Sequence, residues 1–355
     1  MIVELLNDED LYNITRVSHY MAAIGCPNYL RRKGLILSGS RFSLSVRAEG
    51  FKALRVWRRS PDFSAVPMLF CNFNFEDINQ IALEMSWLQN FFISLPLQSS
   101  PIFRHICLNN PETKKLQHCL DLIRAVYETG CHSITVTGLT FQDARTMGRK
   151  KTERRIHLTD LQELTLEYCQ LSPSQWKNFL SRLCIPSLQE LTIVGETSMV
   201  AVYSFLRQHP DIRVIRLDCT AKDVPPSSCR LKLPSLRSLH GSSSRIQHLL
   251  QSLTSPPVLD KLDIESDSLD EVGCCLAMSR GSLALEIRHI SKEASTAYLM
   301  RANMCAPTVK VPTLPCTVST VYIQFEDACD ESVLVSDFPA TKLLNALTIC
   351  LSGLL

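Results

Sequence analysis

Glycine is scarce in this chain, and the familiar signatures of nucleotide-binding and membrane proteins are absent. Only 12 of the 355 residues are glycine, and none forms the G-x-G-x-x-G turn that cradles a dinucleotide. No run approaches the roughly 18 apolar residues that a membrane span needs. Acidic residues such as Glu4 and Asp8 occupy the place of a basic, apolar leader. We therefore expect no membrane partner and a cytoplasmic or nuclear location.

An excess of charge of either sign is also missing. The chain has 37 Lys and Arg against 35 Asp and Glu, a formal net charge of +2. Because this balance gives no overall attraction to polyanions, we expect no nucleic-acid partner. One local basic cluster comprises Arg145, Arg149, Lys150, Lys151, Arg154 and Arg155. Such a cluster could bind phosphate groups or serve as a nuclear import signal. The alternative, which we favour, is a solvated loop between two repeats.

Patterns that carry chemistry are missing as well. The 15 cysteines are spread along the chain without a Cys-x-x-Cys pair, and no histidine pair has metal-ligand spacing. We expect no metal site and buried free thiols. No G-x-S-x-G, H-E-x-x-H or nucleotide-binding loop occurs. We therefore predict no catalytic residues, no cofactor and no enzymatic activity; a hydrolase on an α/β fold is a disfavoured alternative.

Short segments of the form L-x-x-L-x-L recur in the middle of the chain. Their matching positions are Leu164, Leu191, Ile215, Leu239 and Leu262, at steps of 27, 24, 24 and 23 residues. Leucine-rich repeats have a period of roughly 20–29 residues. We predict an α/β fold, a leucine-rich-repeat solenoid in which a parallel strand ladder buries these five side chains beneath outer helices. A doubly wound α/β domain is the alternative, but it favours Gly-rich turns.

The segments between the strands have the apolar spacing of helices. Residues 173–183 place Trp176, Phe179 and Leu180 on one face, and Ser172 is a suitable N-terminal cap. Further helices are predicted at residues 116–127, 198–206 and 244–253. Weaker strands are predicted at residues 53–57, 102–108, 132–136, 283–287, 318–323 and 344–349. The solenoid should cover residues 36–355 and be most regular at 156–290.

Residues 1–35 differ from the repeats and are predicted to form a small helical segment. Asn7 can cap a helix that begins at Asp8. Pro27 is expected to open a second short helix over residues 28–33. The apolar stripe of the first helix comprises Leu11, Ile14, Val17 and Met21.

This N-terminal segment resembles the second part of an F-box. Residues 2–11 (IVELLNDEDL) and 14–18 (ITRVS) follow the family's order of an apolar helix, an acidic Asp-Leu step and a Val-Ser before a closing helix. Residues 29–35 and 233–241 are similar to F-box/leucine-rich-repeat-like proteins of mushroom-type fungi. The family's opening Leu-Pro step is absent, so the F-box is N-terminally incomplete. Residues 343–355 are apolar and end without a polar cap, and for this reason we expect the chain to be a truncated product.

The resemblance implies a substrate receptor of a Skp–cullin–F-box ubiquitin ligase. The F-box would bind a Skp-family adaptor, and the repeats would hold an unknown protein substrate. On this resemblance the adaptor-binding residues are Leu5, Leu6, Asp10, Leu11 and Val17. We expect adaptor binding to be weak because the F-box is incomplete. The alternative is a leucine-rich-repeat scaffold with no ubiquitin-ligase role, whose N-terminal helices only cap the solenoid.

Residues that alternate with the core leucines should point into the concave face of the solenoid. Those predicted to contact a partner are Glu163, Thr165, Glu190, Thr192, Arg216, Asp218, Asp263 and Glu265. With Glu167 and Glu286 included, seven acids stand against three bases, namely Arg216, Lys261 and Arg288. We therefore expect a protein partner with a basic segment. The alternative is that these are solubilising charges on an unused face.

Overall fold

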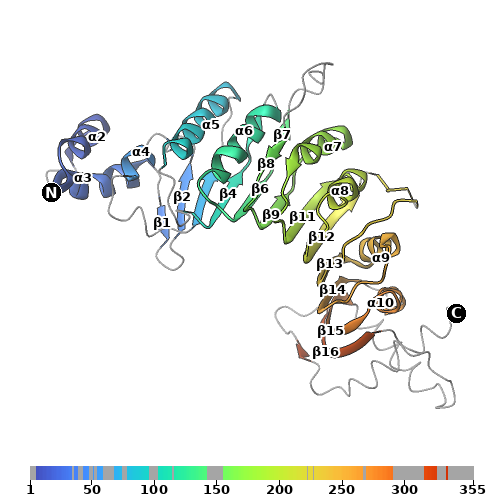
Figure 1. Ribbon diagram of the computed structural model, residues 1–355. Coiled ribbons are helices and arrows are strands. Elements are labelled where there is room, and N and C mark those ends of the chain that lie inside the picture. The colour runs from blue at the N-terminus through green and yellow to red at the C-terminus, as the bar shows by residue number, and fades with distance from the viewer. Residues whose placement is uncertain are drawn as a thin grey trace, which may run out of the picture. The chain divides into compact units, whose positions relative to one another are not determined.

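The structure is a computed structural model in which the chain divides into two compact units (Figure 1). Unit 1 comprises residues 1–188 and 195–198, and unit 2 comprises residues 189–194 and 199–355. The residues that the structure describes are 5–33, 36–38, 43–47, 51, 54–58, 68–73, 78–95, 103–113, 116–141, 155–221, 223–226, 228–266, 269–290, 316–325 and 333–334. The predicted boundary after residue 35 remains a prediction.

Near the N-terminus of unit 1 lie the helices α2 (Asp8–Val17) and α3 (His19–Arg32). The side chain of Asn7 accepts a hydrogen bond from the Asp10 amide at 2.8 Å, which confirms the predicted start of α2. The predicted second helix is wrong, because Ser18 caps α3 ten residues before residue 28 and accepts from the Met21 amide at 3.2 Å. Pro27 therefore lies inside α3 instead of opening a helix.

The contact between α2 and α3 uses a different stripe from the predicted one. Leu11 and Thr15 are the buried residues of α2, whereas Val17 and Met21 are exposed. Gly25 allows the close approach of α3, since a Cβ there would lie 3.2 Å from Thr15 Cγ2. The predicted stripe fails at Val17 and Met21 because α2 ends at Val17 and the chain turns at Ser18.

The described helices that follow the strands of unit 1 lie on one side of its sheet (Figure 1). Its strands, in spatial order, are β1 (Ile36–Ser38), β2 (Ser43–Arg47), β3 (Met68–Asn72), β4 (His105–Asn109), β6 (Ser133–Thr137) and β9 (Glu163–Glu167). Only β1 is antiparallel to its neighbour. The helices that follow the strands are α4 (Leu54–Trp57), α5 (Ile78–Ile93), α6 (Leu116–Tyr127) and α7 (Pro173–Arg182).

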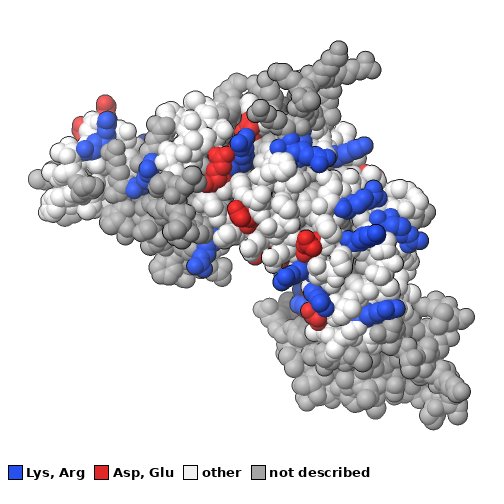
Figure 2. Space-filling model, in the orientation of Figure 1, with Lys and Arg blue, Asp and Glu red and all other residues white. Residues whose placement is uncertain are grey.

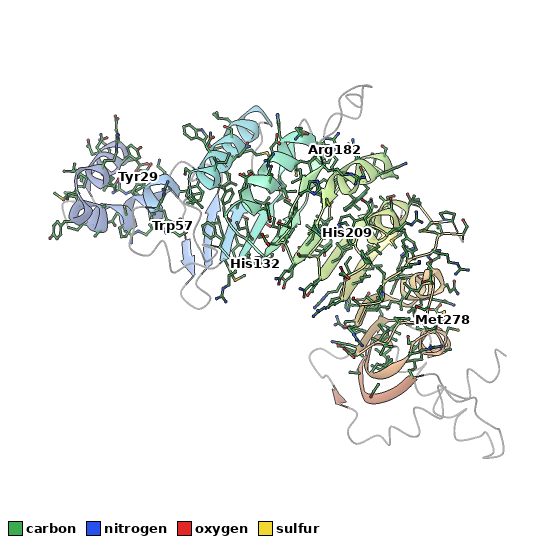
Figure 3. All side chains as sticks on the ribbon, viewed as in Figure 1. Tyr29, Trp57, His132, Arg182, His209 and Met278 are labelled. Carbon is green, nitrogen blue, oxygen red and sulfur yellow. The ribbon has the colours of Figure 1, made fainter. Side chains whose placement is uncertain are left out.

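Several predicted elements in the sheet region of unit 1 are confirmed, and the predicted strand at residues 53–57 is wrong. Helices α6 and α7 match their predicted ranges, and Ser172 and Gln175 form a capping box at the start of α7. Residues 53–57 were expected to form a strand but contain α4. Leu54 and Trp57 (Trp57 is labelled in Figure 3) are three residues apart on a helix and both fully buried. Trp57 stacks on Phe103 with ring centroids 5.9 Å apart.

Short two-stranded pairs border the sheets. The pairs are parallel: β5 (Glu112–Thr113) with β7 (Thr140–Phe141), and β8 (Ile156–His157) with β10 (Leu183–Cys184). In chain order, β5 and β7 come just after β4 and β6, whereas β8 and β10 come just before β9 and β11.

Unit 2 repeats the same arrangement. Its strands are β11 (Glu190–Thr197, whose last residues belong to unit 1), β12 (Val214–Ala221), β13 (Ser238–Ser242), β14 (Lys261–Glu265), β15 (Gly281–Ile290), β16 (Cys316–Phe325) and β17 (Val333–Leu334). The described pairs from β12 to β16 are parallel, and β17 is antiparallel to β16. Helices α8 (Met199–Leu206), α9 (Ser243–Ser252) and α10 (Leu269–Ala277) cover one side of the sheet (Figure 1).

The predicted ladder of apolar residues is present in each unit. In unit 1 Leu164 pairs with Ile134, and the same register continues back to Ile106 and Leu69. In unit 2 Ile215, Leu239 and Leu262 pair in register and the ladder continues to Leu285. Leu191 is fully buried, and the Val214 amide bonds to the Gln189 carbonyl at 2.9 Å, as Ser238 bonds to Arg213 one strand further on. The predicted α/β class with a parallel strand ladder is confirmed.

Candidate protein-binding face

The side of the unit 2 sheet opposite α8, α9 and α10 is a mostly polar surface, here called the open face. Its members are Glu190, Thr192, Val194, Val214, Arg216, Asp218, Ser238, His240, Ser242, Lys261, Asp263, Glu265, Ala284, Glu286 and Arg288. Side chains alternate along a strand, so these residues point away from the leucine ladder. The strand register brings six of the predicted contact residues together here, and the remaining two, Glu163 and Thr165, lie on β9 in unit 1.

Exposure of the predicted contact residues varies across the strands. Arg216, Asp218 and Glu163 are exposed, and a second group is half-buried: Thr165, Glu190, Thr192 and Glu265. Asp263 differs from the prediction of an exposed contact, because only 3% of its surface is exposed. Its neighbours on β13 and β15 cover it with long polar side chains.

Asp263 is the centre of an ion-pair network that crosses β13, β14 and β15. Its Oδ2 atom lies 2.7 Å from His240 Nδ1 and 2.6 Å from the guanidinium of Arg288. Arg288 also pairs with Glu286, Nε to Oε1, at 3.1 Å. Lys261 completes the network, with its ammonium 2.7 Å from Glu286 Oε2 and 3.9 Å from Asp263 Oδ2. Polar and charged groups from three strands thereby meet at one buried carboxylate.

The network keeps the Asp263 carboxyl ionised despite its burial. Burial by itself raises the pKa of Asp263, but the hydrogen bond and charge of His240 and the charges of Arg288 and Lys261 bring that pKa below its usual value. Burial likewise lowers the pKa of Arg288, and the charges of Asp263 and Glu286 outweigh that effect and raise it. The Asp263 carboxylate and the Arg288 guanidinium are therefore both ionised at neutral pH.

A second, separate ion pair lies nearer the start of the sheet in unit 2. Arg216 Nε is 3.1 Å from Glu190 Oε1, and the Arg216 side chain is half exposed. Asp218 and Glu265 form no ion pair with any described residue. The open face thus carries both paired and unpaired acids.

The helix-free side of unit 1 carries uncharged polar groups on β3, β4 and β6, beside the acids Glu163 and Glu167 of β9. Asn109 donates to Asn72 Oδ1 at 2.6 Å, and His105 Nδ1 lies 2.8 Å from Ser133 Oγ. Burial lowers the pKa of His105, although Glu163 and Glu167 oppose this effect. Strand β3 supplies Asn72 but lacks the L-x-x-L spacing, and its residues before Asn72 are all apolar, so no alternation of polar and apolar residues marks the strand in the sequence.

The residues predicted for adaptor binding are split by the structure. Leu5 and Val17 are 87% and 74% exposed, Asp10 is exposed, and Leu6 is half-buried. Leu11 is fully buried between the N-terminal helices, so it supports their packing and offers no contact surface, which corrects that assignment. Sequence reasoning missed Tyr20, which is 74% exposed just after the α2–α3 turn and beside the exposed Met21.

Some predicted features fall outside the described residues. These are the strand at 344–349, the apolar end at 343–355 and all of the basic cluster except Arg155, which is exposed. Among the residues that the structure does describe, no group of three or more His, Cys, Asp or Glu is arranged to hold a metal ion. None of the described helices combines the length and apolar character needed to cross a membrane.

Comparison with known proteins gives no assignment. No protein-family model matches the chain, and it matches neither a curated protein nor a solved structure. The geometry of the two units is thus the basis for any functional proposal.

Proposed function

We propose that this chain is a non-enzymatic protein-binding repeat protein of the leucine-rich-repeat type that acts as the substrate receptor of a Skp–cullin–F-box ubiquitin ligase. The observation that carries the binding role is the helix-free sheet face, where side chains from successive strands stand in register over a fully buried ladder. A rigid strand ladder holds its polar side chains in fixed places, which suits recognition of an extended protein surface.

The ligase part of the proposal concerns the N-terminal helices. They resemble part of an F-box, and large apolar side chains are exposed near their junction: Val17, Tyr20 and Met21. Exposed apolar groups that gather on a small helical module are typical of a protein–protein contact. We propose that these residues, with Leu5, face a Skp-family adaptor.

Affinity capture by a purified Skp-family adaptor tests the ligase role. Val17→Glu should reduce capture of the full chain by about tenfold, because it places a charge in an apolar contact. Val224→Glu is the matched control, since Val224 is 71% exposed but lies in unit 2. Equal capture of both variants, or no capture of the unaltered chain, would contradict the ligase role.

A scaffold without a ligase role is the second candidate. The burial of Leu11 favours it, because the Leu of the Asp-Leu step is then explained by packing of α2 on α3 alone. In that case the open face would still bind protein, while adaptor capture would be absent for every variant.

A further inference from the structure

Lys261 lies between two carboxylates on the open face. Its ammonium is 2.7 Å from Glu286 and 3.9 Å from Asp263, on the next strand and on its own strand respectively. Two carboxylates that converge on one cation form a site for a basic side chain. In the free protein the chain's own lysine occupies that site.

The Asp263 carboxylate has hydrogen-bonding capacity that the protein itself does not use. His240, Arg288 and Lys261 all approach Oδ2, whereas Oδ1 is buried and has no hydrogen-bond partner among the described residues. A buried acceptor without a donor is costly and is uncommon in folded proteins. A guanidinium has five N–H donors in a planar fork and can reach both oxygens of a carboxylate, whereas one ammonium cannot span them as well.

The surroundings of Lys261 leave room for an exchange of side chains. At the same register its neighbours are Ser238 on β13 and Ala284 on β15, both small. The Lys261 side chain is 48% exposed, so its flexible stem can swing into solvent. An incoming side chain can then lie over Ser238 or Ala284 and reach the same two carboxylates.

The charge around the site favours a basic partner. The open face carries five acids (Glu190, Asp218, Asp263, Glu265 and Glu286) and three bases (Arg216, Lys261 and Arg288). If Lys261 leaves its place, two carboxylates lose one of their cations and the local excess of negative charge increases. Such complementarity raises the encounter rate and the selectivity for positively charged segments.

We propose that Asp263 and Glu286 form the anchor for an arginine side chain of the bound protein, and that Lys261 holds this place in the free state. The inference rests on the protein-binding role proposed above and names its substrate class: proteins with an exposed, arginine-containing extended segment. Lys261 thereby acts as an internal competitor that weakens binding of unsuitable segments.

Fluorescence anisotropy with three short labelled peptides tests the proposal on the full chain. The peptides alternate Gly with Arg, Lys or Glu. We expect the Arg peptide to bind best and the Glu peptide not to bind. Lys261→Met should tighten binding of the Arg peptide by about two- to fivefold, the effect of removing one exposed competing ion pair.

Two Glu→Gln variants separate the anchor from general charge. Glu286→Gln should weaken binding of the Arg peptide by about tenfold, because it removes a charged acceptor. Glu190→Gln makes the same charge change on the same face, outside the anchor, and should have a much smaller effect. Asp263→Asn should also weaken binding, provided that circular dichroism shows it to be folded.

The anchor is wrong if Lys261→Met leaves binding unchanged or weaker, or if both Glu→Gln variants lose the same affinity. Equal binding of the Glu peptide, or no binding of any peptide by either the unaltered chain or Lys261→Met, also overturns it. Capture by the Skp-family adaptor is measured separately and does not involve the open face. Failure of the anchor therefore remains distinguishable from failure of the ligase role.

Discussion

Asp263 is the most buried acid among the described residues, and its environment links stability to pH. Its pKa is lowered in the folded protein, because the hydrogen bond and charge of His240 and the charges of Arg288 and Lys261 outweigh the effect of burial. A lowered pKa contributes stability above the unfolded-state pKa, and that contribution is lost as the pH falls through the folded-state pKa. Acid therefore removes part of what holds β13, β14 and β15 together.

The first prediction concerns Asp263→Asn. Urea unfolding at a series of pH values should show a lower midpoint for the variant at neutral pH, and the difference should shrink below about pH 4. The asparagine keeps the shape but has no charge to lose. Parallel pH profiles for the two proteins would show that Asp263 does not contribute through its ionisation.

A second prediction at the residue scale concerns the thiols. Burial raises the pKa of Cys169 to about 12, while Cys184 is only half-buried. The thiolate is the reactive form, so alkylation of the folded chain by iodoacetamide at about pH 8 should label Cys184 well before Cys169. Peptide mass spectrometry gives the two rates, and unfolding in urea should make them similar. Comparable rates in the folded chain would contradict the burial of Cys169.

Burial of the thiols was predictable from sequence, but the orphaned oxygen of Asp263 was not. The absence of Cys-x-x-Cys pairs predicted that the cysteines are free thiols buried in the core. Nine of the twelve described cysteines are buried. The strand period correctly placed Asp263 on the helix-free side beside His240. Its burial depends on the reach of Arg288 and Lys261 from neighbouring positions, which no spacing along the chain specifies.

At the scale of elements, the apolar ladder carries the fold. The third prediction is that Leu191→Ala destabilises the protein by roughly 2–5 kcal/mol, the usual cost of emptying a buried leucine site. Leu191 is fully buried on β11, whereas the control residue Val258 is 49% exposed and its change to Ala should cost well under half as much. Chemical denaturation measures both. Similar small losses would mean that Leu191 is not part of the core.

Helices and strands were predictable where the repeat spacing is regular, and they were missed where tertiary packing determines the local structure. The L-x-x-L-x-L pattern predicted β9 and the strands of unit 2 up to β14. Helix α5 was missed because apolar residues occur all round it, so no single face stands out. Residues 53–57 alternate like a strand, yet Leu54 and Trp57 are buried together on a helical turn, and tertiary packing overrides the local pattern.

At the scale of the whole molecule, a net charge near zero conceals charges that are separated in space. In unit 2 acids predominate on the open face, while Figure 2 shows Lys and Arg gathered over α8 and its surroundings. In unit 2 the basic residues outside the open face that have no ion pair with any described residue are Arg207, Arg213, Arg230, Lys232, Arg237, Arg245 and Arg280. Overall composition predicted no nucleic-acid binding, and it could not reveal this separation.

The separated basic residues allow a last prediction about polyanions. We expect a labelled single-stranded RNA to be retained weakly at low salt and released near physiological salt, because a few scattered charges give only non-specific, salt-sensitive binding. Arg230→Glu combined with Lys232→Glu should abolish the low-salt retention and leave binding of the Arg peptide to the open face unchanged. The matched control is the same pair changed to Gln, which should have about half the effect. Filter binding across a salt series measures retention. RNA that stays bound at physiological salt would overturn the expectation, because such binding requires a specific nucleic-acid site. The exposed acids Asp211 and Asp260 in the same unit oppose a site of that kind.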